Sequence, residues 1–264
     1  ATEAPLELRL GGRALAVIMR TPGADRELAA GFLLAERIIR SADDIGTIAY
    51  CTDATADGTG GADATGTDVR GSIITVTLDP RAATHAAEHL AARRSVMASA
   101  ACGVCGRETL ASMQSGLAPL VPGLRVPASV VASLPGRLRE RQPLFASTGG
   151  LHAAAVFDTS GAILASAEDV GRHNAVDKAI GSLLLRDALP AGNGMLCVSG
   201  RTSYEIVQKA WCAGLPLVAS VSAPSSLAVA LAAQAGITLV GFVRESGLNI
   251  YTEPGRVLGP DAGA

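Results

Sequence analysis

Residues 195–243 read MLCVSGRTSYEIVQKAWCAGLPLVASVSAPSSLAVALAAQAGITLVGFV, and this stretch decides the fold class. Short apolar runs alternate in it with longer segments of helical spacing. The pattern predicts strands at Met195 to Ser199, Leu217 to Val221 and Ile237 to Val243, and helices at Tyr204 to Ala213 and Ser225 to Ala235. Gly214 and Gly236 follow the helices, where glycine commonly ends a helix. The predicted order is therefore strand, helix, strand, helix, strand.

The strands in this stretch are continuously apolar and do not alternate with polar residues. Leu217-Val218-Ala219 and Ile237-Thr238-Leu239-Val240 are the clearest cases. Such runs are typical of a parallel sheet that helices bury on both faces. We therefore predict an α/β protein with a three-layer α/β/α C-terminal domain.

The N-terminal residues predict a smaller α+β domain. Leu6 to Leu10 and Ala14 to Met19 are expected to pair through a turn at Gly11-Gly12, and an amphipathic helix follows from about Asp25 to Ile39. Two further strands are expected at Ile45 to Tyr50 and Ser72 to Leu78, on either side of a Gly/Ala/Asp/Thr-rich insert at 53–68. A polar helix is expected to follow at Arg81 to Arg94.

The chain is accordingly divided into four segments. Residues 1–94 form the N-terminal domain, residues 95–107 a mobile cysteine loop, residues 108–142 a helical connection interrupted or restarted at Pro135, and residues 143–264 the C-terminal domain. A hairpin strand at Ala162 to Ala167 and a helix at Ala175 to Leu185 are expected at the start of the last segment.

Composition excludes several function classes. The 264 residues are 48% hydrophobic with a net charge of −2, which is enough for a large core but lacks the basic stripe that duplex nucleic acid needs. Aromatic residues make up only 3%, so a stacking surface for single strands is not expected. No apolar run reaches the roughly 18 residues of a membrane span, so no membrane crossing is expected.

Cys102 and Cys105 form a C-x-x-C pair in a segment of small residues. The spacing lets each sulfur influence or attack the other. Three arginines flank the pair and favour the thiolate form: Arg93, Arg94 and Arg107. The sequence therefore predicts nucleophilic sulfur chemistry on a mobile loop.

Four other interpretations of the pair are weaker. Half of a zinc knuckle would need a second ligand pair, and Cys51, Cys197 and Cys212 are isolated. A thioredoxin-like dithiol belongs where a strand opens into a helix. A zinc deaminase needs H-x-E, whereas this chain has HAAE at 85–88. A structural disulfide suits an oxidising compartment, but five cysteines without a recognisable signal peptide indicate the cytosol. We expect no zinc.

Polar clusters follow three of the predicted strands, where ligands gather in α/β sheets. They are Glu168 to Asn174, Ser199 to Glu205 and Arg244 to Asn249. In the first cluster carboxylates, a guanidinium and an imidazole converge on one turn, which favours ligand contact over a simple cap by Asn174. In the second, backbone N–H groups and Arg201 are suited to a phosphate, although Ser203 as a plain N-cap explains the sequence equally well. The glycine patterns of ATP and NAD sites are absent, so neither cofactor is expected.

Taken together, these segments resemble the formate dehydrogenase accessory sulfurtransferase family over most of the chain. The resemblance rests on ELAAGFL at 27–33, CGVCG at 102–106, TGGLHAA at 148–154, EDVGRHNAVDK at 168–178, SYEIVQKA at 203–210, GLPL at 214–217, VSAPSSLA at 221–228 and LVGFVR at 239–244. Several long motifs in the same order make it specific.

The resemblance implies a sulfurtransferase that is cytoplasmic and homodimeric. It also implies that the C-terminal domain binds the cofactor and has a cytidine-deaminase-like fold, without the zinc of the deaminases. Members of the family accept sulfur from a cysteine desulfurase as a persulfide. They pass it to the molybdenum of bis(molybdopterin guanine dinucleotide), which is bound as a substrate and then activates formate dehydrogenase. Two alternatives stay open, namely a non-catalytic cofactor carrier or chaperone and a vestigial deaminase-fold hydrolase.

The resemblance also implies roles for individual residues. Cys102 would carry the persulfide with Cys105 assisting. A loop would contribute to the cofactor site, namely Phe242, Val243, Arg244, Glu245, Ser246 and Gly247. The family often has glycine soon after the arginine, where this chain has Glu245-Ser246. Further expected cofactor contacts are Arg201 and Arg172 to pyrophosphate, His173 beside them, and Asp169 to a guanine edge.

Overall fold

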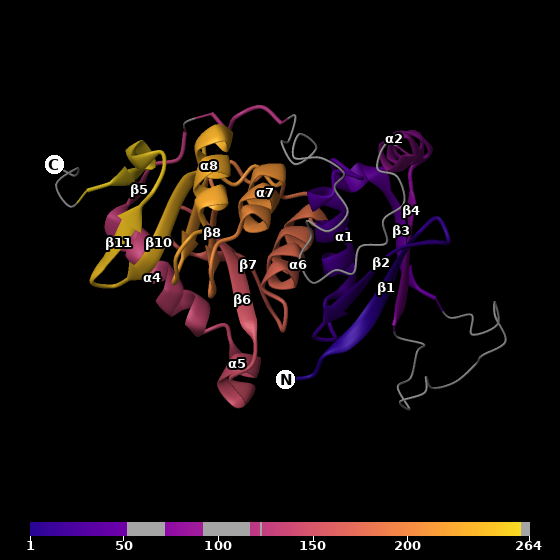
Figure 1. Ribbon diagram of the computed structural model, residues 1–264, viewed down its shortest axis with the longest axis horizontal. Coiled ribbons are helices and arrows are strands. Elements are labelled where there is room, and N and C mark those ends of the chain that lie inside the picture. Colours follow the sequence, from indigo (N-terminus) through magenta and orange to yellow (C-terminus); the bar gives the residue numbers. More distant parts are fainter. Residues whose placement is uncertain (52–71, 92–116, 122, 260–264) are drawn as a thin grey trace.

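The computed structural model describes residues 1–51, 72–91, 117–121 and 123–259 (Figure 1). The predicted insert at 53–68 and the cysteine loop at 95–107 lie outside the described residues. So do Cys102, Cys105 and the arginines that flank them, and their expected roles stay predictions.

A four-stranded sheet forms from the N-terminal residues. Its strands are β1 (Ala4–Leu10), β2 (Arg13–Arg20), β3 (Ile45–Tyr50) and β4 (Ile73–Leu78), in the order β2-β1-β4-β3. β1 runs parallel to β4 and antiparallel to β2, while β3 is antiparallel to β4. The predicted hairpin and both later strands are thus confirmed, and positive φ angles at Gly11 and Gly12 explain the glycine pair in the turn.

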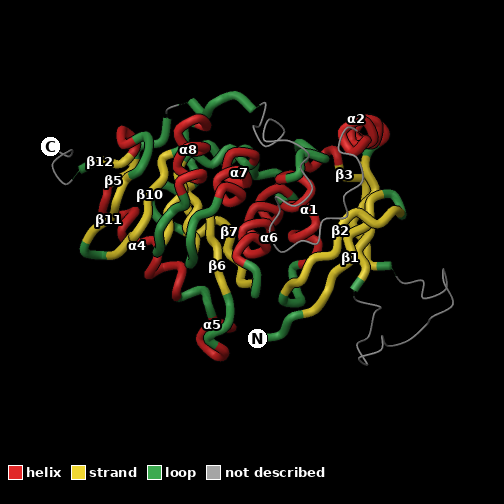
Figure 2. The backbone as a smooth tube through the Cα atoms, in the orientation of Figure 1, coloured by secondary structure: helices red, strands yellow, loops and turns green. Residues whose placement is uncertain are grey.

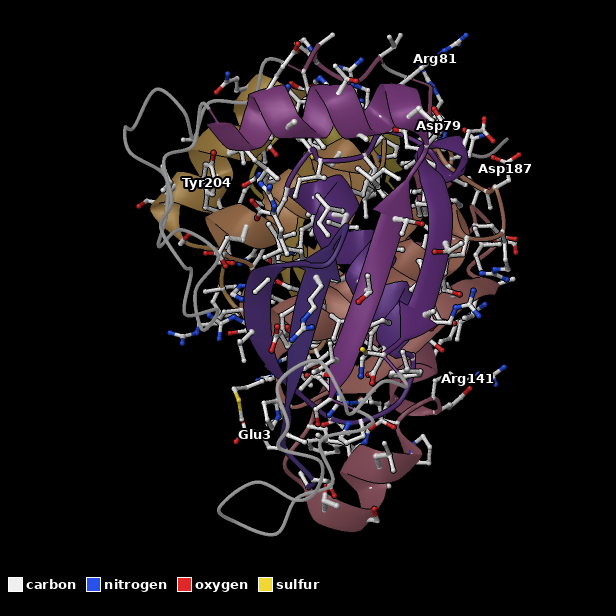
Figure 3. All side chains as sticks on the ribbon, turned by 90° about the vertical axis from the view of Figure 1, so that its right-hand side faces the viewer. Glu3, Asp79, Arg81, Arg141, Asp187 and Tyr204 are labelled. Carbon is white, nitrogen blue, oxygen red and sulfur yellow. The ribbon has the colours of Figure 1, made fainter. Side chains whose placement is uncertain are left out.

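The two N-terminal helices take different positions relative to this sheet. α1 (Asp25–Ala35) lies behind the sheet and α2 (Pro80–Ala91) across one end of it, beside Asp79 (Figure 3). α1 ends earlier than predicted, because the chain turns at Arg37 with a φ of 60°. Ile38 and Ile39 are nevertheless buried, so the apolar pattern predicted burial correctly and helix length wrongly.

A six-stranded sheet forms the centre of the C-terminal part. Its strands are β6 (His152–Phe157), β7 (Ile163–Asp169), β8 (Met195–Val198), β9 (Leu217–Ser220), β10 (Thr238–Arg244) and β11 (Gly247–Ile250), in the order β11-β10-β9-β8-β6-β7. β8, β9 and β10 are parallel, as predicted. β6, β7 and β11 are antiparallel to their neighbours, because short hairpin turns join β6 to β7 and β10 to β11. The predicted hairpin strand at Ala162 to Ala167 is confirmed as β7.

Helices cover both faces of this sheet, as Figure 2 shows. α6 (Arg172–Leu184), α7 (Tyr204–Cys212) and α8 (Ser226–Ala235) lie on one face, and α4 (Ala128–Arg139) lies on the other. Strand residues alternate between the two cores: Leu196 and Val198 face α6 to α8, and Met195 and Cys197 face α4. The α/β class is confirmed.

Two features of the segment before β6 differ from the prediction. α4 continues through Pro135, so the predicted interruption is wrong. Burial of Val131, Leu134 and Leu138 on one stripe of α4 holds the helix together across the proline. A short helix, α5 (Pro143–Thr148), follows, and the two-residue strands β5 (Val126–Pro127) and β12 (Val257–Leu258) pair with each other.

The two parts of the molecule meet where α1 crosses α6 (Figure 1). Gly31 faces the backbone oxygen of Asp177, and Gly181 faces the backbone oxygen of Glu27. Neither position has room for a methyl group, so the glycines allow the two helix backbones to touch. One apolar core therefore runs from the N-terminal sheet through α1 to α6, α7 and α8.

Among the described residues, no helix combines the length and the apolar character that a bilayer crossing requires.

Candidate functional site

The three predicted polar clusters lie at one edge of the six-stranded sheet. β7, β8, β9 and β10 all run toward this edge, and β6 begins there at His152. Their last residues are followed by Val170, Ser199, Val221 and Glu245. The topology thus brings together segments that are distant in the sequence, as expected for the ligand edge of an α/β sheet.

A pocket of about 550 Å³ opens at this edge, between α4, α5 and the strand ends. Apolar residues form much of its wall: Pro135, Leu138, Phe145, Leu151 and Val221. The polar lining includes Arg139, whose guanidinium carbon lies 4.1 Å from the centre of the Phe145 ring. A few polar groups in a largely apolar hollow are the usual composition of a small-molecule site.

His152 is the titratable residue of this pocket that the sequence prediction missed. Its ring lies against the backbone of Gly200, where an added methyl carbon would be 3.3 Å from Nδ1. Burial, together with the nearby charges of Arg172 and His173, lowers the pKa of His152 below its ordinary value of 6.5. The imidazole is therefore neutral near pH 7 and has one donor and one acceptor nitrogen. The sequence signal that could have identified His152 is its place in the TGGLHAA motif at 148–154.

Arg172, a predicted anion contact, begins α6 beside this pocket. Its Nε is buried and has no hydrogen-bond partner within the described part of the chain. Buried donors without a partner are rare in folded proteins. A guanidinium that retains a free donor beside His152 and Gly200 suits a negatively charged oxygen of a ligand.

His173, the next predicted contact, faces α7. Its Nε2 lies 2.9 Å from Ser203 Oγ and 2.8 Å from Glu205 Oε2. Ser203 occupies the N-cap position of α7, but its side chain makes no capping hydrogen bond and contacts His173 instead. Ser203 is therefore the N-cap residue of α7 by position, as considered, but its hydroxyl does not cap the helix. Glu205 and Ser203 fix the ring of His173 from the α7 side.

Behind His173 lies a second, much smaller cavity of about 40 Å³ between α1, α6 and α7. Lys209 Nζ donates to both carboxylate oxygens of Asp177, at 2.7 and 2.8 Å. Burial raises the pKa of Asp177, and Lys209 opposes that effect. The pair joins α6 to α7 directly below the turn that holds Arg172 and His173.

The two acidic residues of the first cluster have structural roles. Asp169 has no exposed surface, and its carboxylate accepts from Gly171 N, Thr21 N, Asn174 Nδ2 and Lys178 Nζ. Glu168 accepts from the backbone N–H groups of Leu144 and Phe145 at the start of α5. The carboxylate that was expected to meet a guanine edge is therefore fully used inside the protein, and we leave Asp169 out of the proposed ligand contacts.

Asn174 does not cap α6, so that simple interpretation of the cluster is wrong. The N-cap residue is Gly171, and Asn174 lies in the first turn. Its amide donates to Asp169 Oδ1 and to the backbone oxygen of Met19. The predicted start of this helix at Ala175 was therefore three residues late.

The expected cofactor loop, residues 242–247, spans the end of β10, a tight turn and the start of β11. Phe242 has a φ of 53° and is 45% exposed, at a break in the β10–β11 register. Val243 is fully buried, so its side chain faces the core. Arg244 Nη1 donates to the backbone oxygens of Val221 and Val243. Glu245, Ser246 and Gly247 line a further pocket of about 510 Å³ beside the first turn of α4.

Arg201 lies in the connection from β8 to α7 and is exposed. It makes no hydrogen bond or ion pair with any residue that the structure describes. The next residue, Thr202, is 1% exposed, and its buried Oγ1 has no partner within the same described ranges. The structure thus brings Arg172, His173 and the unpredicted His152 together, while Arg201 and residues 242–247 lie at other points of the same edge.

The model of the FdhD/NarQ family matches residues 1–258 of this chain. The chain belongs to the FdhD/NarQ family. Its sequence is 48% identical over 263 residues to the sulfur carrier protein FdhD of Anaeromyxobacter dehalogenans, covering 97% of this chain and 88% of that protein. It is 45% identical over 259 residues to the sulfur carrier protein FdhD of Mycobacterium tuberculosis, covering 97% and 91%.

A solved structure supports the same family assignment. The crystal structure of a protein described as a formate dehydrogenase accessory protein, from Desulfotalea psychrophila, superposes with a TM-score of 0.73 at 27% identity. The superposition covers 98% of this chain and 90% of the other. The resemblance expected from the sequence motifs is therefore confirmed.

Proposed function

We propose that this FdhD/NarQ protein is a sulfur carrier in the maturation of formate dehydrogenase. It accepts sulfur from a cysteine desulfurase as a persulfide on Cys102 and transfers it to the molybdenum of bis(molybdopterin guanine dinucleotide), its bound substrate. The observation that carries the proposal is the likeness to sulfur carrier proteins over 97% of the chain, together with a C-x-x-C pair in its sequence.

The transfer step follows from thiol chemistry. The thiolate of Cys105 attacks the Cys102 sulfur that bears the persulfide, a Cys102–Cys105 disulfide forms, and hydrosulfide leaves toward the metal. The proton of the persulfide departs with the hydrosulfide, and no external oxidant is needed because the outgoing sulfur takes the electron pair of the broken S–S bond. A reductant of the thiol class must then reduce the disulfide before the next cycle.

Support for the substrate site comes from the sheet edge. The substrate has two pyrophosphate groups and two guanine bases, so it needs cationic donors and flat apolar surfaces. The Arg172 guanidinium has a buried free donor, and His152 lines a 550 Å³ pocket with Phe145 and Leu138 in its wall. Glu245, Ser246 and Gly247 line a further hollow of about 510 Å³, and Phe242 and Arg244 precede them in the same loop.

Three further properties belong to the same proposal. The C-terminal part has a cytidine-deaminase-like fold, for which the strands β8 to β10 with helices on both faces are the support. The protein acts in the cytoplasm, and it acts as a homodimer. The family resemblance is the support for the last two properties.

The test is reconstitution of formate dehydrogenase in cells that lack their own accessory protein. Wild-type protein should restore formate oxidation, and the Cys102→Ser/Cys105→Ser double variant should not. A Cys51→Ser variant is the matched control, because it removes a thiol outside the pair. A double variant with full activity would contradict the persulfide proposal and favour a non-catalytic cofactor carrier.

A further inference from the structure

The turn that holds Arg172 and His173 lacks a side-chain cap of its own. α6 begins after Gly171, which has no side chain to accept the free N–H groups of the first turn. Asp169 instead holds this turn from the end of β7: its Oδ1 accepts from the N–H of Gly171 at 2.8 Å and from the side-chain amide of Asn174 at 2.9 Å. Because Asp169 is fully buried, these bonds hold the turn in one conformation.

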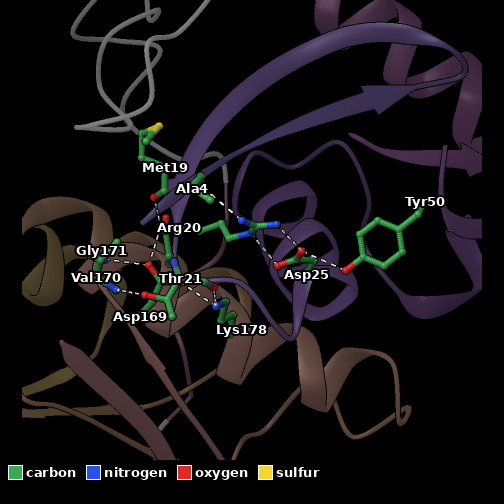
Figure 4. A network of polar contacts seen from close by, with 11 residues as sticks. Ala4, Met19, Arg20, Thr21, Asp25, Tyr50, Asp169, Val170, Gly171 and Lys178 are labelled. Carbon is green, nitrogen blue, oxygen red and sulfur yellow. Dashed lines mark hydrogen bonds and ion pairs between the residues drawn. The ribbon is translucent and has the colours of Figure 1, made fainter. Parts of the chain in front are cut away.

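The other oxygen of Asp169 binds the N-terminal part of the chain (Figure 4). Oδ2 accepts from Thr21 N at 3.1 Å and pairs with Lys178 Nζ at 2.7 Å. Lys178 Nζ also donates to Thr21 O at 2.7 Å, and Thr21 Oγ1 accepts from Val170 N at 3.1 Å. Thr21 thus contacts β7, the turn and α6: its N–H donates to Asp169, its hydroxyl accepts from Val170 N and its carbonyl accepts from Lys178. We call Thr21, Asp169 and Lys178 the latch.

The latch is continuous with the core of the N-terminal part. Arg20, next to Thr21, donates through Nε and Nη2 to the two carboxylate oxygens of Asp25, at 3.0 and 2.8 Å. Tyr50 at the end of β3 donates to the same carboxylate at 3.0 Å. Figure 4 shows the two groups of contacts on either side of residues 20 and 21. The end of β2 therefore joins the N-terminal sheet and α1 to the turn at the site.

From this geometry we propose that Thr21, Asp169 and Lys178 are positioning residues. Their contacts join the N-terminal sheet to the β7–α6 turn and so hold Arg172 and His173 where they can bind the ligand. The proposal rests on the proposed function for the identity of the ligand. It adds that the N-terminal part acts on the substrate site without contacting the substrate. Arg172 is the first residue of α6 and follows Val170 and Gly171, so a shift of this turn moves its guanidinium away from His152 and Gly200.

The mildest test substitutes Thr21. Thr21→Val keeps the shape and the backbone contacts of residue 21 and removes only the acceptor for Val170 N, whereas Thr21→Ser retains that acceptor. Thr252→Val is a control for the loss of a buried hydroxyl at the opposite edge of the sheet, where Thr252 Oγ1 accepts from Leu239 N at 3.0 Å and also donates to Ile237 O at 2.6 Å. Asp169→Asn provides a second, stronger variant.

GDP, which has a guanine base and a pyrophosphate, is the probe for binding. Calorimetry should show that Thr21→Val weakens binding about tenfold, the equivalent of one charge-assisted contact, while Thr21→Ser and Thr252→Val bind as the wild type does. Thermal unfolding should show a loss of stability for Thr252→Val at least as large as that for Thr21→Val, because Thr252 Oγ1 makes two hydrogen bonds. Equal affinity of these two valine variants for GDP would overturn the proposal.

A second readout needs no ligand. Burial, Arg172 and His173 lower the pKa of His152, and Asp169 opposes them. Displacement of Arg172 should raise the pKa of His152 toward 6.5, which NMR titration of the imidazole measures directly. Thr21→Val should show this rise, and Thr21→Ser and Thr252→Val should not. Asp169→Asn does not serve in this titration, because loss of its charge lowers the pKa of His152 directly. An unchanged His152 titration in Thr21→Val would contradict the positioning role. If the wild-type protein fails to bind GDP, the proposed ligand is wrong and this titration alone decides the positioning proposal.

Discussion

At the scale of single residues, burial decides which described thiols can react. Cys197 lies in β8 facing α4, has no exposed surface, and burial raises its pKa to about 12. The thiolate is the nucleophilic form, so only about one Cys197 side chain in ten thousand is reactive at pH 8. Cys197 is therefore a packing residue and no competitor for the sulfur of the predicted pair.

This assignment predicts an alkylation pattern. In native protein treated with iodoacetamide at pH 8, peptide mapping should find Cys197 unmodified, and the same peptide should be fully modified after unfolding in urea. Modification of Cys197 in the native protein at the rate of a free thiol would show that β8 opens locally and would refute the packing role.

Single-residue roles were the hardest part of the site to predict. The sequence identified the polar cluster at 168–174 and its place at a strand end, because turn residues between a strand and a helix are local features. It did not show which side chains are used inside the protein. Asp169 is bound by Thr21, about 150 positions away, and His152 reaches the site from the start of an antiparallel strand. Both facts depend on contacts between distant segments.

At the scale of elements, Glu168 joins α5 to the sheet. Its carboxylate accepts from Leu144 N at 2.9 Å and from Phe145 N at 2.7 Å. These are two of the free N–H groups of the first turn. The short helix, which forms a wall of the 550 Å³ pocket, therefore depends on one side chain from β7 for its place.

Glu168→Gln should loosen α5 and leave the rest of the fold intact. An amide oxygen can replace only part of the carboxylate contact, so hydrogen exchange at Leu144 and Phe145 should be about tenfold faster, a loss of roughly 1.4 kcal/mol in local opening. Glu140→Gln, at an exposed carboxylate just before α5, is the control and should leave both rates unchanged. Equal exchange in the two variants would show that α5 does not depend on Glu168.

The crossing of α1 and α6 depends on glycine. A methyl group at Gly31 or Gly181 would collide with the backbone of the facing helix. Each Gly→Ala variant should lose about 3 kcal/mol of stability in urea unfolding, because backbone cannot move aside as a flexible side chain can. Gly136→Ala in α4, where nothing lies within 4 Å of the added carbon, should instead gain about 1 kcal/mol from helix propensity. Unchanged stability of both α1 and α6 variants would mean that the helices do not touch as described.

Most elements could be predicted from local patterns, since apolar alternation and glycine turns act within a few residues. The predicted β1–β2 hairpin, β3 and the β8-to-β10 unit are examples. The hairpin strand β7 was predicted as well, whereas β11 was not, because its residues were assigned to a polar cluster after the last strand. The continuation of α4 through Pro135 depends on burial against a sheet that lies elsewhere in the sequence.

At the scale of the whole molecule, the N-terminal sheet, α1 and the six-stranded sheet share one apolar core. The sequence predicted an N-terminal and a C-terminal part but not that they pack together. Their packing depends on the glycine contacts and the latch, which join segments about 150 positions apart. In the proposed account this packing has a function: it keeps the anion contacts in place at the sheet edge while the cysteine pair delivers sulfur. The central claim is that the pair carries sulfur as a persulfide.

The most direct test of that claim is intact mass spectrometry after incubation with a cysteine desulfurase and cysteine, followed by mapping of thiol-blocked peptides. We expect a gain of one sulfur atom that depends on the desulfurase, is reversed by dithiothreitol and maps to Cys102 or Cys105. The absence of any gain, or a gain that persists in the Cys102→Ser/Cys105→Ser variant, would contradict it.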